Sequence, residues 1–215
     1  LSHKLYYICD RGNSMEETLK TSIMGKIEEE GYEAFSCYDF LDFGVYKTIS
    51  KCLERMEDNG EIRRIIPGIY DLNTYDRFFG ETPSPNIDAV AKALAREYMW
   101  DICPTGSMAL NMFGISSQVS ASYTYLSSGP YRDYQIGNVY LKFKHTSNRE
   151  ISTYSGKTSI LIQAIKEIGE DNLTPEILIK IQNHLSKKEK ETALVETKNV
   201  TTWIRNIIVD ICQKG

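Results

Sequence analysis

The sequence predicts an α+β protein in which an N-terminal winged helix-turn-helix precedes a mixed α/β domain with a small sheet and a helical C-terminal third. Three observations predict this class. Helical segments are followed by a β-prone pair of runs around Pro67-Gly68, and strand-like runs with turn signals lie further on at 120–146. The stretch "GETPSPN" separates the two parts, so we expect domains at 1–79 and 80–215.

The order of elements in the first part is that of a winged helix. Ser14 with Glu17 predicts a capped helix that ends at Gly31, and Ser36 with Asp39 predicts a second, short one. A third helix is predicted from Val45 to Asn59-Gly60, with an apolar stripe formed by Val45, Ile49, Cys52, Leu53 and Met56. The runs Ile62 to Ile66 and Ile69 to Leu72 then form a hairpin around a type II turn, which would be the wing.

These elements predict a DNA-binding surface. In a winged helix the third helix enters the major groove and the hairpin lies along phosphates. We expect the following residues to contact DNA: Tyr46, Lys47, Thr48, Ser50, Lys51, Arg55, Arg63 and Arg64. Because side chains alternate along a strand, only one of Arg63 and Arg64 can point at DNA, and we expect it to be Arg64. The other would pair with a carboxylate.

The composition of the chain argues against a membrane protein, a disulfide-rich protein and a metal-binding protein. The 215 residues carry a formal net charge of -4, and no apolar run approaches the length of a membrane span. No charged-then-apolar leader is present, so we expect a cytoplasmic protein without a membrane partner. Five scattered cysteines without a C-x-x-C pair and three distant histidines predict neither a disulfide framework nor a metal site, and we expect no cofactor.

The second part predicts a helix over "NIDAVAKALAREYMW", a short strand, a Gly-Ser turn and another helix, followed by strands with turns at Ser128-Gly129-Pro130 and Gly137-Asn138. Helices are predicted over "SGKTSILIQAIKEIG", "TPEILIKIQNHL" and "NVTTWIRNIIVDIC". The last of these carries an apolar stripe that is either core or a subunit interface, so a homo-oligomer stays open.

Two motifs in this part suggest nucleotide chemistry, and neither is complete. Gly156-Lys157-Thr158 ends like a phosphate-binding loop, but the loop's first glycine would fall at Ile151. Gly106-Ser107 opens a helix as in nucleotidyltransferases, whose next strand needs paired carboxylates for metal ions. That strand, "SASYTYLSS", has none. We therefore expect no enzymatic activity.

The succession "YDFLDFGVYKTISKCLERMEDNGEIRRIIPGIYDL", "TGSMALNMFGISSQVSASYTYLSSGPYRDYQIGNVYLKFKH" and "TTWIRNII" resembles the AbiE antitoxins of type IV toxin-antitoxin systems, in a branch catalogued only as a domain of unknown function. The resemblance covers Phe35 to the C-terminus. It implies a bacterial repressor whose winged helix binds its own promoter, with a C-terminal domain that supports antitoxicity or oligomerisation. It also implies a nucleotidyltransferase-like toxin encoded alongside.

Two functions follow as hypotheses. The first is a DNA-binding antitoxin-type transcriptional regulator that represses its own toxin-antitoxin operon through double-stranded promoter DNA. The alternative is a protein-interaction module that captures a toxin or another partner without reading DNA.

Overall fold

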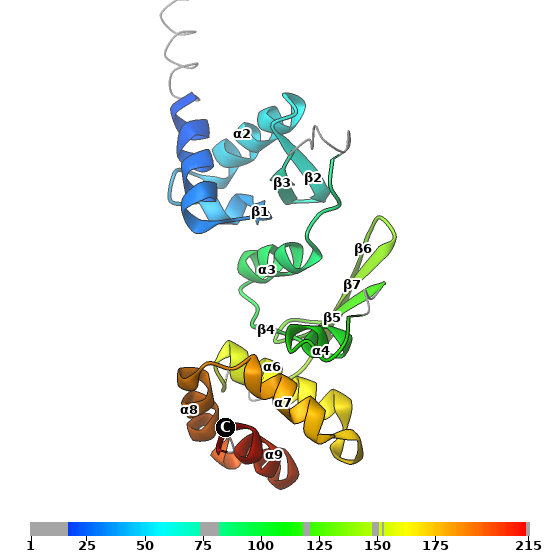
Figure 1. Ribbon diagram of the computed structural model, residues 1–215. Coiled ribbons are helices and arrows are strands. Elements are labelled where there is room, and N and C mark those ends of the chain that lie inside the picture. The colour runs from blue at the N-terminus through cyan, green and yellow to red at the C-terminus, as the bar shows by residue number, and fades with distance from the viewer. Residues whose placement is uncertain (1–16, 74–81, 118–120, 148–150, 152, 214–215) are drawn as a thin grey trace, which may run out of the picture. The chain divides into compact units, whose positions relative to one another are not determined.

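The computed structural model describes residues 17–73, 82–117, 121–147, 151 and 153–213. The chain divides into two compact units, Leu1–Met99 and Trp100–Gly215 (Figure 1). Each contains helices and a small sheet, so the predicted α+β class is confirmed.

The first unit has the element order expected of a winged helix. Residues 17–30 are helical, while the predicted cap at Ser14 lies outside the described residues. The elements that follow are β1 (Phe35–Ser36), the 3-10 helix η1 (Cys37–Phe40), α2 (Tyr46–Asp58), β2 (Ile62–Ile66), β3 (Ile69–Leu72) and α3 (Ile87–Tyr98). The β2–β3 hairpin is called the wing below. Its strand β3 also pairs with β1, so the three strands form an antiparallel sheet in the order β1-β3-β2.

Local signals in the sequence account for these elements. The Ser36 hydroxyl accepts a hydrogen bond from the backbone of η1, and the Asp39 carboxylate accepts the Ser36 N–H at 2.8 Å, so the predicted capping box is confirmed. The turns after α2 and in the wing use Gly60 and Gly68 at φ 71° and 83°, in the left-handed region that glycine tolerates best. Residues of the helix at 17–30, of η1, of α2 and of the wing share one hydrophobic core, which fixes the orientation of these elements. This core includes Ile23, Ile27, Phe35, Phe40, Ile49, Leu53, Met56, Ile62 and Tyr70.

Helix α3 belongs to the first unit, although the predicted boundary at residues 79 and 80 places it in the second. The Arg96 guanidinium donates to Asp39 Oδ1 at 2.7 Å and to the Ala34 carbonyl at 2.9 Å, and it lies 4.3 Å from the centre of the Tyr32 ring. The Asp39 side chain is only 4% exposed and the Arg96 side chain 34% exposed, so the carboxylate of this ion pair is buried and the guanidinium is partly exposed. These contacts join residues that are more than fifty positions apart, so no local sequence pattern predicts them. The predicted domain boundary at residues 79 and 80 lies outside the described residues.

The second unit contains the predicted small mixed sheet. Its first part consists of β4 (Ile102–Pro104), α4 (Ser107–Met112), β5 (Ser122–Ser127), β6 (Arg132–Ile136) and β7 (Val139–His145). The strand order is β4-β5-β7-β6, with β5 and β7 parallel and the other pairs antiparallel. The buried Phe143 ring lies 5.5 Å from the Trp100 ring and 5.9 Å from the Tyr125 ring, which forms an aromatic layer on one face.

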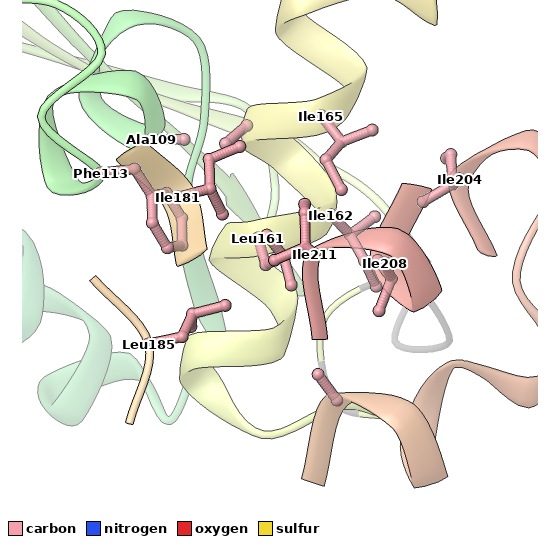
Figure 2. Close-up of a cluster of buried hydrophobic side chains, with 12 residues drawn as sticks. Ala109, Phe113, Leu161, Ile162, Ile165, Ile181, Leu185, Ile204, Ile208 and Ile211 are labelled. Carbon is pink, nitrogen blue, oxygen red and sulfur yellow. The ribbon is translucent and has the colours of Figure 1, made fainter. Parts of the chain in front are cut away.

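The helical third is centred on α6, as Figure 2 shows. It consists of α6 (Gly156–Ile168), η2 (Glu170–Asn172), α7 (Pro175–Asn183), α8 (Lys187–Glu196), η3 (Thr197–Asn199) and α9 (Thr202–Gln213). The apolar stripe of α9 is core: Ile204, Ile208 and Ile211 are buried against α6, and Trp203 and Ile207 pack on the same cluster. Helix α8 was not predicted, because its sequence KKEKETALVE has no apolar stripe and buries only Ala193.

Candidate nucleic-acid interface

The rotation of α2 decides which of its side chains face solvent. Ile49, Cys52, Leu53 and Met56 are buried in the core of the first unit. The predicted DNA-contacting residues lie on the remaining face, which we call the exposed face of α2: Tyr46, Lys47, Thr48, Lys51 and Arg55 are exposed, and Ser50 is half-buried. The structure therefore brings the six predicted helix residues together on one surface.

Val45 does not belong to the buried stripe, so this part of the sequence prediction was wrong. The residue precedes the first helical turn as its N-cap, with extended backbone angles (φ −74°, ψ 150°). This conformation takes the side chain out of the helical period, and Val45 is 70% exposed. The amino end of α2 has no side-chain cap hydrogen bond.

Charge is divided unevenly along α2. Lys47 and Lys51 lie in its first half, and no ion pair joins either to another described residue. Glu54, Glu57 and Asp58 lie in its second half, where Ser50 Oγ donates to Glu54 Oε1 at 3.3 Å. A polyanion is therefore attracted to the amino-terminal half and repelled by most of the carboxyl-terminal half.

An exposed aromatic pair lies beside the amino end of α2. The Tyr38 and Tyr46 rings are 5.6 Å apart, and these side chains are 49% and 51% exposed. Sequence reasoning missed Tyr38, although the run "YDFLDFGVY" holds a conspicuous density of aromatic residues just before the helix. Aromatic side chains left in solvent next to a basic surface suit contact with an apolar or stacked ligand surface.

The wing separates its two arginines, as side-chain alternation predicts. Arg63 lies opposite Asp71 on β3; its Nε donates to Asp71 Oδ1 at 3.0 Å, and its Nη1 donates to the Pro83 carbonyl. The hydrogen bond to Asp71 raises the pKa of Arg63 above its usual value. Because the Asp71 side chain is only 10% exposed, Arg63 is held in place as a structural partner of this carboxylate.

Arg64 occupies the other face of β2, on the side of α2. Its Nη2 donates to Glu57 Oε2 at 2.6 Å, and its guanidinium lies 5.3 Å from the centre of the Tyr70 ring. The Arg64 side chain is 43% exposed. Both arginines thus pair with a carboxylate, but only Arg64 shares a solvent-exposed surface with α2.

The residues of the two nucleotide-like motifs contact other residues of the second unit. Lys157 Nζ lies 5.1 Å from the centre of the Phe113 ring, and Thr158 is buried with its hydroxyl bonded to Ser155. Gly106 starts the short helix α4 at φ 60°, beside the Glu167 carboxylate. Among the described residues, no group of histidine, cysteine, aspartate and glutamate side chains is arranged to hold a metal ion.

Within the described part of the chain, no helix has the length and apolar character needed to cross a membrane. Comparison with curated proteins finds no match. A profile described as a family of unknown function, DUF6088, matches residues 20–194, which span the winged helix-turn-helix arrangement, the mixed sheet and most of the helical third. The chain therefore belongs to the DUF6088 family.

Proposed function

We propose that this chain is a DNA-binding transcriptional regulator of the antitoxin type, which represses its own operon in the cytoplasm. The observation that carries the proposal is the exposed face of α2, where Lys47, Lys51 and Arg55 lie on one surface with Tyr46, Thr48 and Ser50. Ammonium and guanidinium groups bind phosphates, and polar side chains at the first turns of a recognition helix reach base edges.

Two further features support DNA as the ligand. The wing presents Arg64 beside α2, at the position where a wing runs along the phosphate backbone. The acidic net charge of -4 is compatible with this function, because a sequence-specific regulator needs only a local basic surface. The resemblance to AbiE antitoxins supports the same function and adds a nucleotidyltransferase-like toxin encoded alongside as the second partner.

The experiment that tests the proposal is a fluorescence-anisotropy titration with the DNA upstream of the chain's own gene. At about 150 mM salt a specific regulator binds its site on the order of a thousandfold more tightly than shuffled DNA of the same composition. Equal affinity for the two duplexes would contradict the proposal.

A second candidate is an interaction protein that captures a toxin or another partner without reading DNA. The observation that favours it is the exposure of large apolar side chains over a short segment before and at the start of α2: Tyr38, Leu41, Phe43, Val45 and Tyr46 are each at least 38% exposed. Co-expression with the neighbouring reading frame, followed by size-exclusion chromatography, distinguishes this function. A stable complex together with absent DNA binding would favour it over the regulator.

A further inference from the structure

Val45 is placed where neither helix stability nor core packing explains it. An N-cap residue normally stabilises its helix by accepting a backbone hydrogen bond with a side-chain oxygen, which valine lacks. Ser36, Asn86, Thr174 and Ser186 each accept such a bond at the start of another helix, whereas Gly106 of α4 and Ser155 of α6 do not. Val45 is also 70% exposed and therefore adds little to the core. A residue that violates a local rule without a packing gain is expected at a functional surface.

The surroundings of Val45 indicate what that surface contacts. Lys47 and Lys51 follow within two turns, whereas Glu54, Glu57 and Asp58 occupy the far end of the helix. Duplex DNA is a polyanion, so this division of charge favours contact through the amino-terminal tip of α2, whereas at the other end carboxylates offset the positive charges of Arg55 and Arg64. The isopropyl group of Val45 is then part of the tip that meets the base pairs.

The major groove offers one apolar group to such a side chain. Each base pair presents donors and acceptors there, and only thymine adds a methyl group, at C5. On the basis of the proposed DNA binding, we infer that Val45 determines specificity by contacting a thymine C5-methyl in the operator. The base pair that faces the tip of α2 is then a T·A pair, and its recognition requires an apolar group at position 45.

The test combines a single-methyl change in DNA with a matched pair of protein variants. The probe is the upstream DNA fragment that the full chain binds, with each thymine replaced in turn by deoxyuridine, which lacks only the methyl group. For the wild-type chain, one replacement in each bound site should lower the affinity about fourfold, the value of one buried methyl-sized group. Val45→Ser should lower the affinity for unmodified DNA to a similar degree and should show no further loss with that deoxyuridine.

Val45→Thr is the matched control, because threonine keeps one methyl group and can also cap the helix. It should still distinguish thymine from deoxyuridine, unlike Val45→Ser. Both variants should melt at or above the wild-type temperature, because each adds a cap acceptor; weaker binding by Val45→Ser therefore does not reflect unfolding.

The outcomes separate the inference from the proposed function. If the wild-type chain binds the fragment specifically but is insensitive to every deoxyuridine, or if Val45→Ser remains as sensitive as the wild type, methyl recognition by Val45 is wrong while the regulator stands. If the wild-type chain binds no DNA specifically, the methyl recognition by Val45 and the proposed regulator function are both wrong. A Val45→Ser variant that binds DNA normally but loses a co-purifying protein would assign this tip to a protein partner.

Discussion

Arg63 and Asp71 face each other across the β2–β3 ladder, and the guanidinium of Arg63 bonds both carboxylate oxygens of Asp71. The neighbouring Arg64 points to the opposite side and pairs with Glu57 of α2. Two adjacent arginines thus have separate partners, one within the wing and one between the wing and α2. This difference allows their roles to be tested independently.

Replacing Arg63 by alanine should lower the free energy of unfolding and change DNA affinity little. The substitution leaves the Asp71 carboxylate, 10% exposed, without its guanidinium partner. We expect the free energy of unfolding to fall by about 1–3 kcal/mol, less than for a fully buried pair because Arg63 is partly exposed. Urea denaturation measures this loss. The double variant Arg63→Ala, Asp71→Ala should regain part of it, and a double variant less stable than the sum of the singles would contradict the pairing.

Replacing Arg64 by alanine should weaken binding to operator and random DNA alike. Loss of one phosphate contact should reduce the slope of log K against log salt by about one. Glu57→Gln provides a contrasting variant, because it removes a negative charge and releases Arg64 from its ion pair; it should tighten DNA binding. Anisotropy titrations over a range of salt concentrations measure both slopes. An unchanged slope for Arg64→Ala would show that the wing does not contact phosphates.

Lys47→Ala and Lys51→Ala should each weaken DNA binding and leave the fold intact. Both side chains are exposed, opposite the buried residues of α2, so the unfolding free energy should change by no more than about 0.5 kcal/mol. Lys188→Ala on α8 removes another exposed positive charge, from the second unit, and serves as the control. If Lys188→Ala weakens binding as much as the other two, the effect reflects net charge and not the exposed face of α2.

Gly129→Ala should destabilise the second unit. A Cβ atom at this position would overlap the Trp100 indole, which packs on the aromatic layer of the sheet. Overpacking of this kind costs about 1–3 kcal/mol. Gly156→Ala is the matched control, because an added Cβ at this first residue of α6 meets nothing within 4 Å. Thermal unfolding followed by near-UV circular dichroism reports on the two tryptophans, Trp100 and Trp203, which both belong to the second unit. Equal melting of both variants would contradict the predicted clash.

Cys103 should make the second unit sensitive to alkaline pH. Burial raises the pKa of the Cys103 thiol to about 12, whereas an unfolded cysteine ionises near pH 8.5. Because the folded-state pKa is raised, the neutral thiol contributes its full stabilisation at pH values below the pKa of the unfolded chain. This stabilisation is lost as the pH rises toward 12. We therefore expect the unfolding free energy to fall above about pH 9 by up to about 1.4 kcal/mol per pH unit from this thiol. Urea titrations of the wild type and Cys103→Ala at several pH values test this, since the variant should lose that part of the slope.

Much of the first unit was predictable because its signals are local. Ser36 and Asp39 specify the start of η1, the Ile49 to Met56 spacing specifies the buried side of α2, and Pro67-Gly68 specifies the wing turn. The alternation of Arg63 and Arg64 followed from strand geometry alone.

The features that were missed depend on distant contacts or on a shift of backbone angle. Val45 fits the helical spacing in sequence, but its extended backbone removes it from the buried stripe. The pairing of Arg64 with Glu57 depends on how α2 and the wing pack, and helix α8 has too few buried side chains to leave a periodic pattern. The DNA-contacting role of the exposed face of α2 is a prediction from both sequence and geometry.

The Arg96–Asp39 pair has a consequence for how this N-terminal head, residues 17–99, can be exchanged between proteins. Asp39 both caps η1 and accepts the guanidinium of Arg96, so a head severed before α3 would retain a buried carboxylate whose counter-ion had been lost. A head that ends after Met99, at the left-handed turn closing α3, would take its counter-ion with it. Gene fusions that transplant this head intact should therefore join their new partner after residue 99, and natural shuffling of the module would face the same requirement.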